Sequence, residues 1–186
     1  MKKSIINKSE AKVIFYCSGI IIIMSLWLIL RTGNLSDYAV LMSGLLILFG
    51  YVAMVFDINT KKIPNILVLS MLAAWLLLIA PLMFVEPEIG VRILLESVYG
   101  FAIGGGLFLF VYFISSKGLG GGDVKFMAVS GLYLGLSGTI SSILYGTVLA
   151  AVTGLLLILI KKIGRKDAIP LAPFLFAGMM ITLFVN

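Results

Sequence analysis

Residues 126–160, FMAVSGLYLGLSGTISSILYGTVLAAVTGLLLILI, form a run of 35 residues without a charged side chain. A helix that crosses a membrane needs about 20 apolar residues. The run is therefore either one very long helix or two short ones. Gly135, Ser137 and Gly138 lie near its middle and are typical of a turn. The choice between these alternatives decides on which side of a membrane all later residues lie.

The rest of the chain is similarly apolar. Of its 186 residues, 61% are hydrophobic and 12% are charged, whereas about a quarter of the residues of a soluble domain are charged. A small globule has too little interior to bury so many apolar side chains. The composition predicts an all-α, polytopic integral membrane helix bundle.

Seven membrane spans are predicted, and the basic residues orient them. If the long run is split and the N-terminus is cytoplasmic, every lysine and arginine except Arg31 and Arg92 lies on the cytoplasmic side, as the positive-inside rule expects. An unsplit run would place Lys161 and Lys162 outside, so the split is favoured. We expect a multi-pass protein of the cell membrane, with spans near 13–30, 39–56, 66–85, 97–114, 123–136, 139–160 and 169–185.

This topology brings two acidic residues to one membrane face. Asp57 ends the second span and Asp123 begins the fifth. Carboxylates inside a membrane are costly and usually mark functional sites. Each also has a structural interpretation: Asp123 could cap its helix, and Lys61 and Lys62 could compensate Asp57. The acids predicted on or near the other face are interpreted as solvated residues: Asp37, Glu86, Glu88 and Glu96.

The residue types that are missing narrow the chemistry. The chain has no histidine and one cysteine, Cys17, which excludes Ser-His triads, histidine metal sites and an intrachain disulfide. Two carboxylates that share a proton can hydrolyse an amide without metal or cofactor, one acting as base on water and the other as acid toward the carbonyl. From the helix dipoles alone, Asp123 is predicted to be the anion and Asp57 the protonated partner.

Two groups of glycines stand out. Gly118 and Gly120–Gly122 precede Asp123, and glycine permits a second backbone to approach closely. In the fourth span, Gly100 and Gly104 have the small-xxx-small spacing of packed membrane helices. The first group is predicted to serve a site, and the second to serve helix packing.

Three ordered elements resemble a known family. Residues 120–123 form a GxGD motif, Asp57 is followed by Lys62-Ile63-Pro64-Asn65, and residues 169–174 read IPLAPF. Together they resemble the type IV prepilin peptidase family, which includes archaeal preflagellin peptidases. The similarity covers about residues 39–185.

The resemblance implies a membrane aspartyl endopeptidase with a catalytic core at 39–186, preceded by a basic segment and an extra helix at 1–38. Asp57 and Asp123 would be catalytic, with no cofactor. The substrates would be type IV prepilin or pseudopilin precursors of a pilus or protein secretion system, cleaved at the cytoplasmic membrane face. Nucleic acid is not an expected partner. The matching motif-supporting residues are Gly120, Gly122, Lys125, Pro64 and Asn65.

Longer members of that family carry a cytosolic segment, often with paired cysteines, that is associated with N-methylation. Here only about residues 35–39 separate the first two spans, so a short, peptidase-only form is predicted. One alternative is a presenilin-like intramembrane protease, but Phe56-Asp57 and Pro170-Leu171-Ala172 differ from its Tyr-Asp and Pro-Ala-Leu motifs. Another alternative is a small proton-coupled transporter, whose acids would more typically lie near the bilayer midplane within internal repeats.

Overall fold

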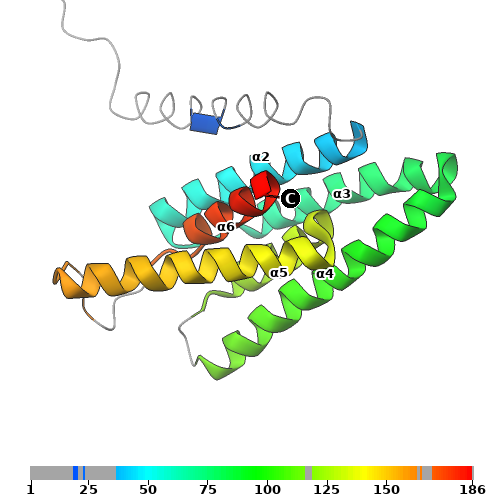
Figure 1. Cartoon of the computed structure of the whole chain (residues 1–186). Helices are drawn as coiled ribbons and strands as arrows, with labels where there is room; N and C mark the ends of the chain where they lie inside the picture. Colours follow the sequence, from blue (N-terminus) through cyan, green and yellow to red (C-terminus); the bar gives the residue numbers. More distant parts are fainter. Residues whose placement is uncertain are drawn as a thin grey trace, which may run out of the picture.

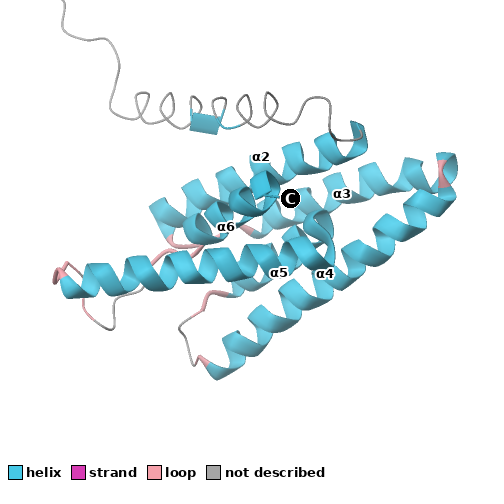
Figure 2. Cartoon of the chain, viewed as in Figure 1, coloured by secondary structure: helices cyan, strands magenta, loops and turns pink. Residues whose placement is uncertain are grey.

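The computed structural model describes residues 19–20, 23, 37–115, 119–162, 164 and 169–185. In this part of the chain every regular element is a helix (Figure 2). The all-α helix bundle predicted from the composition is confirmed. The helices are α2 (Asp37–Thr60), α3 (Asn65–Val85), α4 (Pro87–Ile114), α5 (Gly121–Leu159) and α6 (Ala172–Val185).

The helices have the surface of a membrane protein. By length and composition α2, α3, α4 and α5 can each cross a bilayer, whereas α6 has 14 residues. Large apolar side chains lie on the outside, such as Leu77 (75% exposed) and Phe84 (87% exposed), where lipid would solvate them. The first predicted span, 13–30, lies almost entirely outside the described residues. The count of seven spans therefore stays a prediction.

Gly135 divides α5 into two helices. Its backbone has φ 66° and ψ −173°, a conformation that glycine adopts without the clash that a Cβ would cause. Around this break, the Thr139 hydroxyl donates a hydrogen bond to the Gly135 carbonyl at 2.6 Å. The N–H of Leu136 donates to Glu96 Oε2 at 3.4 Å. The predicted split of the 35-residue run is confirmed.

After the break, α5 folds back along α6 (Figure 1). Gly138 lies against Thr182 near the end of α6, and Gly154 lies against Ile169 just before its start. The two halves of α5 therefore begin and end at the same end of the bundle. The start of α6 lies there as well, where the N–H of Ala172 bonds to Asp57 near the end of α2.

Glycines allow α4 and α5 to touch backbone to backbone. A Cβ on Gly100 would collide with the carbonyl oxygen of Gly131, and one on Gly131 would collide with Gly100. A Cβ on Gly104 would lie 2.6 Å from the oxygen of Met127. The packing role predicted for the glycines of the fourth span is confirmed for Gly100 and Gly104, whereas a Cβ on Gly106 would meet nothing within 4 Å. This contact fixes the first half of α5, which begins with the Asp123 segment.

The orientation of the bundle can be tested with single cysteines in a Cys17→Ser background. Gly164 and Glu88 are both exposed; Gly164 follows the end of α5, whereas Glu88 lies in the first turn of α4. Gly164→Cys is expected to resist an impermeant thiol reagent in intact cells, because it follows Lys161 and Lys162. Glu88→Cys is the matched control and should react, and permeabilised cells should label both. Labelling of Gly164→Cys from outside would show that the lysine-rich end is external.

Candidate functional site: a cavity with two aspartates

Asp57 lies in the last turn of α2 and is buried, with 5% of its surface exposed. Its Oδ2 accepts a hydrogen bond from the backbone N–H of Ala172 at 2.9 Å. Burial of a carboxylate is costly unless hydrogen bonds replace its hydration. The contact with Ala172 offsets part of that cost and connects residues that are 115 positions apart.

Ala172 is the first residue of α6, and the first N–H groups of a helix have no partner within it. Pro173 has no N–H, and the N–H of Phe174 bonds to the carbonyl of Leu171 at 3.0 Å. The Ala172 N–H is therefore the donor that meets the carboxylate. The positive end of the α6 dipole faces Asp57, a contact that the sequence reasoning missed. In the sequence, only the two prolines of the 169–174 segment pointed to a role for the start of α6.

Asp123 lies in the first turn of α5. Its N–H bonds to the carbonyl of Gly120 at 3.1 Å. Gly120, rather than Asp123, is the N-cap residue of this helix. Asp123 Oδ1 is buried and has no hydrogen-bond partner among the described residues. Asp123 is therefore not the N-cap residue that the structural interpretation expected.

Both carboxyl groups line one cavity of about 380 Å³, here called the aspartate cavity. The structure thus brings together the two acids that the topology assigned to one end of the bundle. Two lysines and three glycines supply most of its other walls. The lining residues are Asp57, Lys61, Lys62, Ile63, Asn65, Gly120, Gly121, Gly122 and Asp123.

The glycines before Asp123 differ in what surrounds them. A Cβ on Gly120 would lie 2.9 Å from Asp123 Oδ2, and a Cβ on Gly122 would lie 3.3 Å from both Cβ and the carbonyl oxygen of Ile63. A Cβ on Gly121 would meet nothing within 4 Å. Close approach, rather than a positive φ, explains the need for glycine at 120 and 122.

Pro64, Asn65 and Lys125 join the start of α3 to α5. Pro64 is the N-cap residue of α3, in an extended conformation, and its carbonyl accepts the N–H of Leu67 at 3.1 Å. Lys125 Nζ donates to Asn65 Oδ1 at 3.1 Å. Asn65 also lines the aspartate cavity. These motif-supporting residues therefore lie beside the acids.

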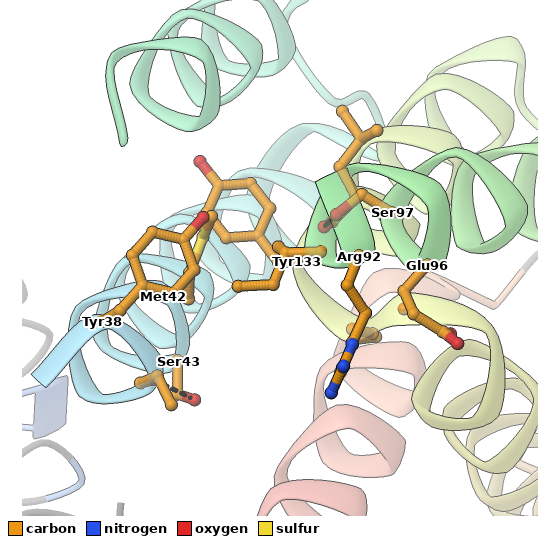
Figure 3. A pocket seen from close by; sticks show the side chains of 12 residues that line it. Tyr38, Met42, Ser43, Arg92, Glu96, Ser97 and Tyr133 are labelled. Atoms are coloured by element: carbon orange, nitrogen blue, oxygen red, sulfur yellow. Dashed lines mark hydrogen bonds between the residues drawn. The ribbon is translucent and has the colours of Figure 1, made fainter. Parts of the chain in front are cut away.

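A second cavity of about 300 Å³ lies near the opposite end of α2 (Figure 3). Tyr38 from α2, Arg92 and Glu96 from α4, and Tyr133 from α5 are among its lining residues. Glu96 is the one carboxylate among them, and it accepts the N–H of Leu136. Glu96, predicted to be a solvated acid, is exposed and also supports the start of the second half of α5. This cavity has no pair of acids.

The family model described as the type IV leader peptidase family matches residues 44–159. The chain belongs to this family. The match includes both aspartates and the glycines of the site, and the resemblance seen in the motifs is confirmed. Within the described residues, no cluster of three or more His, Cys, Asp or Glu side chains is arranged to hold a metal ion.

A relative named prepilin leader peptidase/N-methyltransferase, from Bacillus subtilis (strain 168), is 30% identical over 129 residues. The aligned region is 67% of this chain and 48% of that relative. The chain thus spans about half the length of the curated relative. No solved structure matches the chain.

The geometry bears on which acid holds the shared proton. The dipoles of α2 and α5 alone would place the anion on Asp123, but Asp57 also faces the start of α6. In the structure Asp57 receives a backbone N–H, which stabilises a carboxylate. Asp123 Oδ1 is buried with no hydrogen-bond donor among the described residues. The contacts of the two acids therefore do not follow the dipoles of α2 and α5 alone.

Proposed function

We propose that this protein is a membrane aspartyl endopeptidase that removes the leader of type IV prepilin or pseudopilin precursors at the cytoplasmic face of the cell membrane. The observation that carries the proposal is the presence of two carboxyl groups, from two apolar helices, in one cavity. Membership of the type IV leader peptidase family and the named relative support a peptidase with this class of substrate.

In the proposed mechanism Asp57 is the base and Asp123 the acid. The Asp57 carboxylate takes a proton from water while the water oxygen bonds to the scissile carbonyl carbon. Asp123 gives its proton to the carbonyl oxygen, which forms a gem-diol. The Ala172 N–H holds one oxygen of Asp57 and leaves the other to accept the proton.

The gem-diol then collapses. Asp57 returns its proton to the leaving amide nitrogen, the C–N bond breaks, and one diol hydroxyl gives its proton to Asp123 as the carbonyl re-forms. Both acids recover their starting states, and water is the nucleophile, so the proposed cycle needs no covalent enzyme intermediate, metal or cofactor. This cycle is general acid–base catalysis by two coupled carboxyl groups.

The position of the cavity suggests where the substrate is cut. Asp57 is near the end of α2, and Asp123 is near the start of α5. A site at a membrane edge would meet the junction between a polar leader and an apolar helix. A site near the bilayer centre would be expected for cleavage within a membrane helix. We therefore favour leader cleavage over presenilin-like proteolysis.

We further propose that methyl transfer is absent. The chain has one cysteine and few residues between the first two predicted spans, so the cysteine-containing segment of longer family members has no counterpart there. A cleaved product formed in the presence of a methyl donor should therefore keep an unmodified N-terminus.

The test is cleavage of a candidate prepilin by the protein purified in detergent. Mass spectrometry of the products is expected to give a new N-terminus at the first residue of the apolar run, with no added methyl group. Products that begin deep within the apolar run would favour the presenilin-like alternative. Failure to cleave any prepilin or pseudopilin, by a protein that remains folded, would contradict the proposed function.

A further inference from the structure

A third cavity, here called the α3 cleft, adjoins the aspartate cavity and shares Asn65 with it. It has a volume of about 470 Å³, within the range of about 300–1,000 Å³ that is usual for ligand sites. Four apolar side chains of α3 line it, together with a polar pair at one end. The lining residues are Asn65, Ile66, Val68, Leu69, Leu72 and Lys125.

The cleft follows one face of α3. Asn65, Val68, Leu69 and Leu72 have the i, i+3, i+4, i+7 spacing of residues on one side of a helix. Val68 is 8% exposed and lies deep in the recess, whereas Leu69 is 60% exposed. The described part of the chain leaves Leu69 uncovered and available to an apolar partner.

Asn65 lines both the α3 cleft and the aspartate cavity. The hydrogen bond from Lys125 to Asn65 crosses from α5 to α3 at their common border. A polypeptide bound across the acids would therefore enter the cleft within a few residues, since consecutive Cα atoms are about 3.8 Å apart. The lining of the aspartate cavity, which holds two aspartates and two lysines, is less apolar than that of the α3 cleft.

We infer that the α3 cleft binds the apolar residues of the precursor that directly follow the scissile bond. This inference rests on the proposed function, in which the cut lies at the start of an apolar run. The cleft is the apolar surface that continues from the two acids. Ile66, Leu69 and Leu72 would then determine which side chains are accepted on that side of the cut.

The test compares two exposed leucines of one helix. Leu69 lines the cleft, whereas Leu77 is 75% exposed and lies outside it. Leu69→Ala is expected to raise the KM for the precursor about tenfold with kcat within about twofold, because it removes apolar contact that is made equally in the ground and transition states. Leu77→Ala should change neither constant. Equal effects of the two variants would overturn the inference.

A change in the precursor identifies the contact. Replacing its first apolar residue after the cut by alanine should raise KM for the wild-type enzyme but add little for Leu69→Ala, because residues in contact are not additive. Fully additive effects would overturn the inference. If wild-type enzyme cleaves no precursor, the proposed function fails and the inference fails with it. If the precursor is cleaved normally but the two effects are additive, the inference about the α3 cleft fails and the proposed function stands.

Lipid is the competing occupant of an apolar cleft in a membrane. A photoreactive side chain at position 69 of the Asp123→Asn variant, which should bind without cleaving, is expected to crosslink to the first residues of the precursor's apolar run. The same group at position 77 should crosslink to lipid. Crosslinks to lipid alone at both positions, with precursor present, would overturn the inference.

Discussion

Replacement of Asp57 or Asp123 by asparagine is expected to lower kcat for leader cleavage by at least about 10⁴-fold, as for groups that act as one catalytic unit. Asparagine keeps the size of the side chain but cannot take or give a proton in the proposed cycle. Either change removes one of the two proton transfers at the scissile carbonyl. The measurement is single-turnover cleavage of a prepilin at saturating enzyme.

The double variant distinguishes a dyad from two independent residues. If the acids act together, Asp57→Asn with Asp123→Asn should be no slower than either single variant, because the second change removes nothing that still works. Glu96→Gln is the matched control, since Glu96 is a carboxylate in the cavity near the opposite end of α2. It should retain activity within about threefold. Turnover by either aspartate variant close to the wild-type rate would exclude the two-aspartate mechanism.

The sequence predicted features that depend on local pattern or on charge. The turn at Gly135 followed from small residues in a long apolar run, together with Lys161 and Lys162, which required another crossing of the membrane. The meeting of Asp57 and Asp123 at one end followed from the same topology. Each of these predictions needed only the order of apolar and basic segments along the chain.

The contact between Asp57 and α6 could not be predicted in this way. It depends on the position of Ala172 beside a helix end that lies 115 residues earlier, and no periodicity or charge pattern determines that packing. The proton assignment made from the sequence left this contact out, because it considered the helix that carries each acid and not the helix that faces it. The motif at 169–174 indicated that the segment mattered but not what it touches.

The glycines give the second large effect. Gly122→Val is expected to lower activity by about 10²-fold or more, the loss typical of a displacement of about 1 Å at a catalytic group. A Cβ on Gly122 would lie 3.3 Å from the Ile63 carbonyl oxygen, so the larger side chain must move α5 or the 61–64 segment and thereby separate the acids. The measurement is kcat/KM for the precursor, together with the thermal stability of the variant in detergent.

Gly121→Val is the matched control, because it places the same β-branched residue in the same helical turn. A Cβ at that position meets nothing within 4 Å, so its activity should stay within about threefold of wild type. Both variants carry the same local cost of a β-branched residue in a helix, and a difference between them therefore reports the contact with Ile63. Activity close to wild type in both variants would mean that the spacing between Gly122 and Ile63 does not position Asp123. An equal loss of activity in both would instead assign the effect to the start of the helix.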